Sequence, residues 1–330
     1  MRVLITGSSG QIGTNLGQAL LGLGHSVAGL DNRPNPWTSA FPTQLVDLSQ
    51  TLPAQRGALG AVEVGAVDAV VHLAAHAKVH ALVERPLGAL ENHQMVTNAL
   101  EFARVNGVPI ILASSREVYG NLTTGQPVPE SAADFRLAPS PYAAMKLAGE
   151  SLAAAYRRCY GLSFAVVRFS NVYGRHDNDL QRLERAIWIF RQNILAARPV
   201  TIFGATKTLD FTYVDDAVAG LVSCLERLVA REDMVVGETF NLAFGEGHRL
   251  VDVVTLIADA LGKRAEMQLR DARPGEVTWY VADLTKARRA LAYRPRVPVQ
   301  EGIRRAMRWA QEVEEARVEE ARVEQSPRTG

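Results

Sequence analysis

Short apolar runs alternate with amphipathic stretches along the first half of the chain. Continuous runs bounded by small or polar residues are typical of strands buried on both faces of a parallel sheet. Such runs stand at residues 3–6, 26–30, 67–75, 109–115 and 164–168. Between the first two, Leu16, Leu20 and Leu23 recur at helical spacing. The alternation predicts an α/β fold with a Rossmann-type, doubly wound parallel sheet.

A glycine-rich turn separates the first strand from the first helix. Gly7 permits a tight turn, Gly10 lets a pyrophosphate approach the backbone, and Gly13 lets the helix lie close to the sheet. Asp31 ends the second strand, where a carboxylate accepts hydrogen bonds from an adenosine ribose and repels a 2′-phosphate. The order of strand, glycine turn, helix, strand and acid predicts a dinucleotide site. It favours NAD over NADP, although Arg33 lies close enough to weaken that preference.

Residues 140–146 combine a helix start with two polar side chains on one face. Ser140 can cap the helix and Pro141 suits its first turn. Tyr142 and Lys146 then stand at i and i+4, so both project from the same side. A nearby ammonium favours phenolate and lowers the pKa of a tyrosine from its usual value of about 10. We therefore expect Tyr142 to act as a general base or acid near neutral pH.

The G-x-x-G-x-x-G spacing, taken with Tyr142-x-x-x-Lys146, resembles the extended branch of the short-chain dehydrogenase/reductase superfamily. That branch is the NAD-dependent epimerase/dehydratase family, which acts on nucleotide sugars. The resemblance covers roughly residues 1–310. It implies an NAD-binding Rossmann domain and a smaller C-terminal substrate-binding domain from which strands can cross back, followed by a charged tail. The implied boundaries are residues 1–167, 168–312 and 313–330.

The resemblance also implies which residues hold the cofactor and carry the chemistry. In the family, the serine hydroxyl bonds the sugar 4-hydroxyl and relays its proton to the tyrosine, while hydride leaves C4 for the nicotinamide. The lysine supports the phenolate and holds the nicotinamide ribose. The catalytic set carried over is Ser115, Tyr142, Lys146 and Glu117. The cofactor set is Gly7, Gly10, Gln11, Ile12, Gly13, Asp31, Asn32, Asp47, Leu48, Leu73, Ala74, Ala75, Tyr142 and Lys146.

Three residues of the second half are expected to bind the substrate, again by resemblance. Asn171 matches the asparagine that binds the diphosphate, Phe203 lies in the short strand lining the nucleobase pocket, and Arg273 supplies a guanidinium suited to phosphate. One departure stands out. The family segment usually begins Arg-Asp-Phe, but here Leu209 replaces the arginine, with Lys207 close by.

The run Ser-Arg-Glu-Val-Tyr-Gly at 115–120 leaves the reaction open. Family 4,6-dehydratases carry an acid for C6 where this chain has Arg116, and a C5 base where it has Glu117. Decarboxylases of uronic-acid sugars also carry a glutamate here. Glu117 is thus a C5 base, a structural partner of Arg116, or a residue holding a substrate hydroxyl.

We favour a 4-epimerase of a UDP-hexose, either UDP-glucose or UDP-N-acetylglucosamine, over a UDP-sugar dehydratase. A decarboxylase or reductase, including a hydroxysteroid dehydrogenase, is a further alternative. The alternative of another class is a catalytically silent NAD-binding regulator, because a fold does not dictate a function. Such relatives tend to lose the tyrosine or the lysine, and both are present here.

The composition limits which partners and which cellular location we expect. The 330 residues carry a net charge of +1, which gives no basic footprint for nucleic acid. Two cysteines exclude a disulfide scaffold, and no apolar run reaches membrane-spanning length. We expect a cytoplasmic protein that binds no metal, nucleic acid or membrane. The resemblance also implies a homodimer whose interface is formed by the helix of Tyr142 and the helix around residues 96–104.

Overall fold

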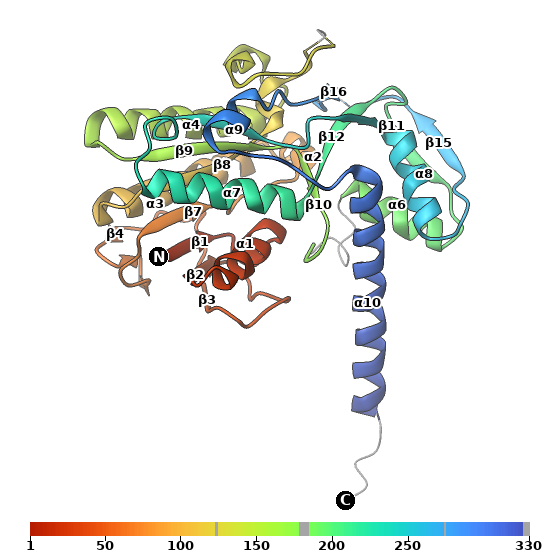
Figure 1. Cartoon of the computed structure of the whole chain (residues 1–330), viewed down its shortest axis with the longest axis horizontal. Coiled ribbons are helices and arrows are strands. Elements are labelled where there is room, and N and C mark those ends of the chain that lie inside the picture. The colour runs from red at the N-terminus through yellow and green to blue at the C-terminus, as the bar shows by residue number, and fades with distance from the viewer. Residues whose placement is uncertain (123–124, 178–184, 274, 326–330) are drawn as a thin grey trace, which may run out of the picture.

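A computed structural model describes residues 1–122, 125–177, 185–273 and 275–325, with side chains to residue 319. Its centre is a seven-stranded sheet in which all neighbouring strands are parallel (Figure 1). In spatial order the strands are β13 (Thr239–Leu242), β9 (Phe164–Phe169), β8 (Ile110–Ser115), β7 (Ala69–His72), β1 (Arg2–Thr6), β2 (Ser26–Asp31) and β3 (Thr43–Leu45). All five predicted strand runs lie in this sheet.

Helices cover both faces of the sheet (Figure 1). Successive residues of β1 serve the two cores, because side chains alternate along a strand. Val3 and Ile5 pack into one buried cluster and Leu4 into the other. The first cluster lies under α1 (Gln11–Gly22) and α7 (Val214–Val229), and the second under α3 (Gly88–Asn106) and α4 (Pro141–Tyr160). The prediction of a doubly wound parallel sheet is confirmed.

The helix ends show how local sequence sets element bounds. Helix α4 begins at Pro141, and the Ser140 hydroxyl accepts a hydrogen bond from the Ala143 N–H at 3.3 Å, as the capping pattern predicts. The prediction for the first helix needs one correction. Leu23 was expected on its buried stripe, but it is 55% exposed, because α1 ends at Gly22 and Leu23 follows as the C-terminal cap.

The smaller part of the structure is built on β12 (Thr208–Tyr213). This strand pairs in parallel with β10 (Asn171–Tyr173) and β16 (Trp279–Tyr280), and antiparallel with β14 (Gly247–Arg249). Beside it, β11 (Val200–Phe203) and β15 (Met267–Arg270) form a parallel pair next to α6 (Ala186–Leu195) and α8 (Leu250–Ala260) (Figure 1). Both short sheets lie beyond one end of the large sheet (Figure 1).

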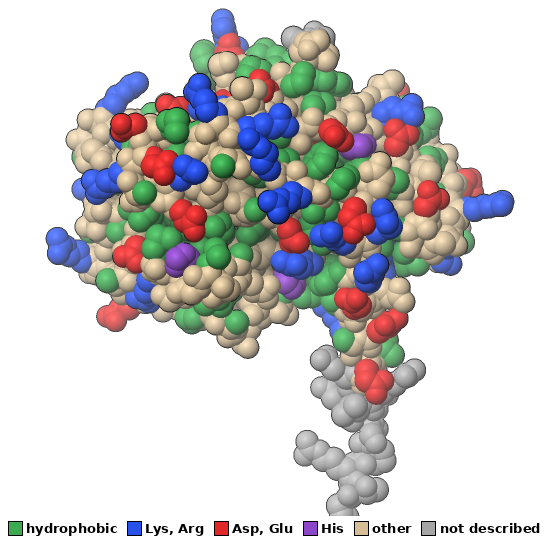
Figure 2. All heavy atoms as spheres, viewed as in Figure 1, with side chains coloured by type: hydrophobic (Ala, Val, Ile, Leu, Met, Phe, Trp, Pro, Cys, Tyr) green, Lys and Arg blue, Asp and Glu red, His purple; other side chains and the backbone are tan. Residues whose placement is uncertain are grey.

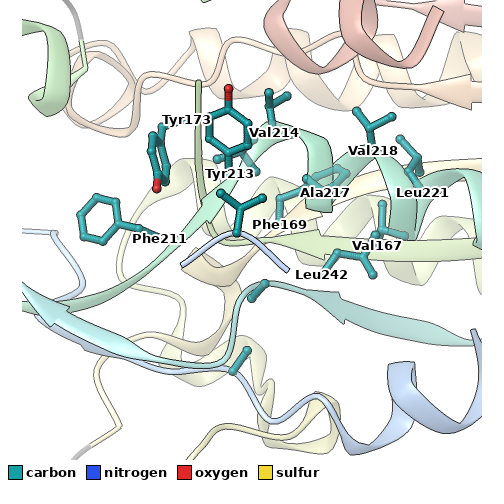
Figure 3. Close-up of a cluster of buried hydrophobic side chains, with 14 of the residues drawn as sticks. Val167, Phe169, Tyr173, Phe211, Tyr213, Val214, Ala217, Val218, Leu221 and Leu242 are labelled. Carbon is teal, nitrogen blue, oxygen red and sulfur yellow. The ribbon is translucent and has the colours of Figure 1, made fainter. Parts of the chain in front are cut away.

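A buried cluster joins the two parts (Figure 3). The rings of Tyr173 from β10 and Tyr213 from β12 meet edge to face, with centroids 5.7 Å apart. They belong to the same apolar cluster as Phe169 of the large sheet and Leu221 of α7. The strands of the smaller part are therefore packed directly onto the core of the large sheet.

The remaining elements are short. They are the antiparallel meander β4 (Ala54–Gln55), β5 (Ala58–Leu59) and β6 (Val62–Glu63), the helices α2 (Val79–Glu84) and α9 (Thr285–Ala290), and the 3-10 helices η1 (Arg116–Tyr119), η2 (Glu130–Ala132) and η3 (Phe135–Leu137). None of the helices in the described ranges is both long and apolar enough to cross a bilayer. Acidic and basic side chains are mixed over the face shown in Figure 2, in keeping with the small net charge.

The chain crosses between the two parts more than once. Strand β13 comes late in the sequence, yet it pairs with β9 at the edge of the large sheet. The division at residues 167 and 168 therefore stays a prediction about domains. The last helix, α10 (Val299–Gln325), runs on into the predicted tail, where Arg191 anchors Glu314 through two contacts of 2.7 Å. Residues 326–330 of that tail lie outside the described ranges.

Candidate active site and cofactor cradle

The glycine turn between β1 and α1 leaves no room for side chains. Gly7 has a φ of +73°, and a Cβ there would lie 2.7 Å from the Ala74 nitrogen. A Cβ on Gly13 would collide with the Gly7 carbonyl oxygen. Gly10, which caps α1, gives its first turn no side-chain hydrogen bond. The turn is thus a bare cradle at a helix N-terminus, which fits the pyrophosphate of a dinucleotide.

Asp31 is held at the carboxyl end of β2, beside this turn. Its carboxylate accepts from the Ser9 N–H at 3.0 Å and the Arg33 N–H at 3.2 Å. Burial raises the pKa of Asp31, and these hydrogen bonds oppose the rise. The Arg33 side chain lies 3.9 Å away, and Asn32 is exposed. The position fits a ribose ligand.

The other predicted cofactor residues lie farther along the same sheet edge. Leu73, Ala74 and Ala75 follow β7 and are half-buried next to Gly7. Leu48 is buried, whereas the exposed Asp47 carboxylate accepts from the side chains of Ser49 and Gln50. The Ser49 hydrogen bonds lower the pKa of Asp47. Its contact with adenine stays a prediction.

The Gln11 side chain is turned toward residues 174 and 185. It is buried, and its Nε2 donates to the Gly174 carbonyl oxygen at 3.1 Å, while its Oε1 accepts from Arg185 at 2.8 Å. Asn15, one turn later, receives Arg175 Nε at 2.7 Å. Helix α1 is therefore joined through these amides to the substrate side. The candidate phosphate ligands are instead the backbone N–H groups of Gln11 and Ile12 at the start of α1.

Ser115 and Tyr142 meet at the centre of the site. Ser115 ends β8, and Tyr142 stands in the first turn of α4 with an exposed fraction of 6%. The Ser115 side chain is close enough to the Tyr142 phenol to lower its pKa. Burial nevertheless raises the pKa of Tyr142 to about 12, with the Ser115 side chain opposing the rise and the charge of Glu117 adding to it. The predicted lowering of this pKa is wrong for the structure without ligands.

The Lys146 ammonium explains the difference. Its Nζ donates to the Ala113 carbonyl oxygen at 2.8 Å and lies 5.7 Å from the centroid of the Tyr142 ring. Burial lowers the pKa of Lys146 to about 8, and the charge of Glu150 opposes this shift. The lysine thus stands beside the tyrosine on one helix face, as the spacing predicts, but its charge is directed at the strand.

A buried polar network lies behind the candidate catalytic residues. Glu150, one turn beyond Lys146, accepts from Ser114 at 2.5 Å and from two nitrogens of Arg168 at 2.9 and 2.6 Å. Arg168 also donates to the Tyr119 hydroxyl at 3.0 Å. Sequence reasoning missed Glu150, although its i+8 spacing from Tyr142 puts it on the same helix face.

Arg116 and Glu117 are buried next to Ser115. Arg116 Nη2 lies 2.9 Å from Glu117 Oε1 and donates to Asn171 Oδ1 at 3.2 Å. The Glu117 N–H donates to the Ser115 hydroxyl at 3.2 Å. Asn171 Nδ2 donates in turn to the Asp210 carbonyl oxygen at 2.9 Å. The predicted substrate residue Asn171 is thus brought within one contact of the catalytic segment.

The expected nucleobase and phosphate residues also come together. The Arg273 guanidinium stacks 3.8 Å from the centroid of the Phe203 ring. Leu209 is buried and Lys207 Nζ lies 3.1 Å from Glu276 Oε2, close enough to Arg116 and Glu117 for their charges to shift its pKa. Burial is the larger effect and lowers the pKa of Lys207. Lys207 stands two residues before Leu209, which occupies the position of the usual family arginine.

Arg185 was not predicted at all. It caps α6, and its Nη1 donates to the Val172 carbonyl oxygen at 3.1 Å as well as to Gln11. Its charge lowers the pKa of Tyr142, in the same sense as that of Arg116. No local pattern marks it, since its role depends on contacts with other segments, above all with Gln11, which is 174 positions away.

Comparison with known proteins identifies the family. The family model described as the NAD dependent epimerase/dehydratase family matches residues 3–243. The chain belongs to this family. An uncharacterized UDP-glucose epimerase of Bacillus subtilis is 31% identical, over 92% of this chain and 96% of the relative. A UDP-glucuronate 4-epimerase of Thermodesulfobacterium geofontis is 30% identical, over 94% and 96%.

Solved structures of this epimerase/dehydratase family share the fold. The UDP-glucose 4-epimerase of Thermus thermophilus in complex with NAD has a TM-score of 0.81 and 30% identity, covering 94% of this chain and 99% of that one. The UDP-glucuronic acid 4-epimerase of Bacillus cereus, with UDP-glucuronic acid and NAD, has a TM-score of 0.81 and 27% identity, over 95% and 100%. The predicted family and the NAD cofactor are confirmed.

Proposed function

We propose that this protein interconverts UDP-hexoses that differ in configuration at C4, with UDP-glucose or UDP-N-acetylglucosamine as the first substrates to test. The observation that carries the proposal is the placement of the Ser115 side chain beside the buried Tyr142 phenol, one helical turn from Lys146. Relatives named as UDP-glucose and UDP-glucuronate 4-epimerases support the reaction at C4. They do not distinguish between the sugars.

The chemistry assigned to the chain is proton transfer at the 4-hydroxyl. Tyr142 takes this proton, with Ser115 bonding the same hydroxyl and stabilising the phenolate. When bound, NAD accepts the hydride of C4 and returns it to the opposite face. Since burial raises the pKa of Tyr142 to about 12, deprotonation near neutral pH requires a further positive charge close to the phenol. Lys146 meets this requirement if its ammonium turns from Ala113 toward the cofactor ribose.

The substrate is proposed to lie between the two parts of the molecule. Asn171 and Arg273 would bind the diphosphate, and the Phe203 ring would pack on the nucleobase, where Arg273 now stacks. Lys207 is a candidate for the phosphate charge that Leu209 does not supply. Binding of the diphosphate would draw Lys207 away from Glu276, a partner with an exposed fraction of 24%.

A dehydratase reaction is less favoured than epimerisation, although Glu117 could serve as a C5 base. A 4,6-dehydratase needs an acid to protonate the leaving hydroxyl of C6, and Arg116 stands where the family places that acid. A guanidinium stays protonated at every pH that the protein tolerates, so it is a poor proton donor. Glu117 is also held by Arg116 at 2.9 Å. The pair therefore favours a binding role over C5 deprotonation.

Proton NMR in deuterium oxide tests the proposal. The NAD-loaded protein is incubated separately with UDP-glucose and with UDP-N-acetylglucosamine. The proposal expects the C4 epimer with hydrogen retained at C5. Deuterium at C5 with loss of the 6-hydroxyl would identify a dehydratase instead, and a protein that binds NAD but changes no UDP-sugar would match the silent regulator.

We also propose that the enzyme is a cytoplasmic homodimer built on α3 and α4. These helices pack closely, since a Cβ on Gly149 of α4 would lie 3.4 Å from Val96 of α3. Half-buried Leu147 and Leu152 on α4 are available to a second copy. Light scattering after size exclusion should give twice the mass of 35.9 kDa. A monomer at micromolar concentration would contradict the dimer.

A further inference from the structure

The Arg116–Glu117 pair is incomplete. Their side chains have exposed fractions of 10% and 8%, and one nitrogen faces one oxygen at 2.9 Å. The other two atoms, Arg116 Nη1 and Glu117 Oε2, are buried and have no hydrogen-bond partner among the described residues. A buried donor and a buried acceptor left open cost stability. The two open atoms therefore point to a ligand group that hydrogen-bonds both of them.

The pair stands next to the reacting carbon of the proposed substrate. Arg116 and Glu117 directly follow Ser115, and the Glu117 N–H donates to the Ser115 hydroxyl. The charges of both side chains act on the pKa of Tyr142. Arg116 also reaches Asn171 on the substrate side. A sugar whose 4-hydroxyl meets Ser115 and Tyr142 would place a neighbouring substituent against the pair.

We propose that Arg116 and Glu117 form a donor–acceptor clamp for a sugar hydroxyl beside C4, and that this clamp selects neutral hexoses against uronic acids. The inference rests on the proposed function. A hydroxyl group both donates and accepts, so it can donate to Glu117 Oε2 while it accepts from Arg116 Nη1. The pair as a whole is neutral, which suits an uncharged group.

Epimerisation makes the clamp meet two different substituents. Inversion at C4 requires the ring to present opposite faces to the same side of the site. Rotation of the ring about its C1–C4 axis does this, and it exchanges the C3 edge with the C5 edge. The clamp therefore meets the 3-hydroxyl in one orientation and the C6 group in the other. A sugar with hydroxyls at both places satisfies the clamp in both orientations.

A carboxylate at C6 fails in one of these orientations. It accepts hydrogen bonds but has no proton to donate, so Glu117 Oε2 would stay unpaired beside a like charge. Arg116 is already neutralised by Glu117, and the nearby Lys207 is paired with Glu276. The pair itself thus offers no surplus cation for a uronate, and Arg185, the other guanidinium whose charge acts on Tyr142, lies 3.3 Å from the Asp177 carboxylate. The clamp therefore selects the sugar in two ways, because it attracts a hydroxyl group and repels a carboxylate.

The test compares kcat/KM for UDP-glucose and UDP-glucuronate in the NAD-loaded wild type and in variants of Glu117. The wild type should favour UDP-glucose by about tenfold or more. Glu117→Gln and Glu117→Thr remove the charge, so each should shift the ratio toward UDP-glucuronate by about tenfold or more. Glu117→Asp keeps the charge and should keep the preference. The matched control is Glu232→Gln, which alters a surface partner of Arg227 and should leave the ratio unchanged.

The outcomes separate this inference from the proposed function. Epimerisation of UDP-glucuronate in preference to UDP-glucose by the wild type would overturn the clamp and leave the 4-epimerase standing. An unchanged ratio in both neutral variants, with turnover measurable, would also overturn it. If neither sugar is epimerised although NAD and UDP bind, the proposed function fails and the clamp fails with it. A shift toward UDP-glucuronate in both neutral variants, with the preference kept in Glu117→Asp, supports the clamp.

Discussion

The ammonium of Lys146 lies 5.7 Å from the centroid of the Tyr142 ring but donates its hydrogen bond to the Ala113 carbonyl oxygen. The two side chains share a helix face, yet the side chain that most opposes the rise in the pKa of the phenol is Ser115. Burial then dominates and raises the pKa of Tyr142 to about 12. The side chains around Tyr142 therefore favour the protonated phenol near neutral pH.

Removal of the Tyr142 hydroxyl should stop turnover without loss of binding. Tyr142→Phe deletes the proposed proton acceptor, and general acid–base groups typically contribute about 10²- to 10⁴-fold to the rate. We expect kcat to fall by at least that range, while calorimetry shows that NAD and UDP still bind. Tyr160→Phe, at the exposed end of the same helix, is the control and should keep full activity. A kcat of Tyr142→Phe within about threefold of the wild-type value would show that Tyr142 is not the proton acceptor.

Two glycines of α1 should respond in opposite ways to alanine. A Cβ on Gly13 collides with the Gly7 carbonyl oxygen, so Gly13→Ala must displace the cofactor turn. We expect NAD affinity to fall by about tenfold or more, because a small displacement disrupts the phosphate contacts at the helix start. Gly22→Ala meets nothing within 4 Å and should be neutral or stabilising by up to about 1 kcal/mol. Equal NAD affinities in the two variants, measured by fluorescence titration, would contradict this packing.

The network behind the site should be sensitive to loss of one charge. Glu150→Gln leaves the Arg168 guanidinium, 6% exposed, without its carboxylate. Breaking a buried pair in this way costs about 3 kcal/mol of unfolding free energy. The same change at Glu232, in an exposed pair with Arg227, should cost less than about 1 kcal/mol. Urea denaturation of both variants gives the comparison, and equal losses would mean that the buried network contributes little.

Acid should destabilise the protein through His72. Its ring is buried against Thr6 at 2.8 Å, and burial, assisted by the charge of Lys146, lowers its pKa from 6.5 to about 3. The unfolded chain binds a proton below 6.5 and the folded chain does not, so stability falls as the pH drops from 6.5 toward 3.

The His72 contribution is about 1.4 kcal/mol per pH unit. We expect His72→Gln to flatten the dependence of unfolding free energy on pH across this window. His80→Gln, whose ring is 49% exposed, should not. Parallel pH profiles for wild type and His72→Gln would show that His72 is protonated equally in both states.

Local patterns predicted the parts of the site that neighbours in sequence determine. The Gly7–Gly13 turn, the Ser140 cap and the shared face of Tyr142 and Lys146 all depend on residues within one or two helical turns. Short-range sterics and helix geometry are enough to place them.

The remaining features depend on contacts between distant segments. The Gln11 amide bonds residues 163 and 174 positions away, so no local pattern could show that it joins the two parts. The hydrogen-bond partner of the Lys146 ammonium could not be predicted for a related reason. Its long side chain can reach either the phenol or the strand, and the position of the Ala113 carbonyl oxygen becomes known only when β8 and α4 are packed together.

The most direct test of the central claim uses UDP-glucose labelled with deuterium at C4. The NAD-loaded enzyme and its Tyr142→Phe variant are incubated with this sugar in ordinary water, and the products are followed by deuterium and proton NMR. The account predicts UDP-galactose that keeps the deuterium at C4 with the wild type, and unchanged UDP-glucose with the variant. Deuterium lost to water, or a product lacking the 6-hydroxyl, would contradict epimerisation at C4 by Ser115, Tyr142 and Lys146.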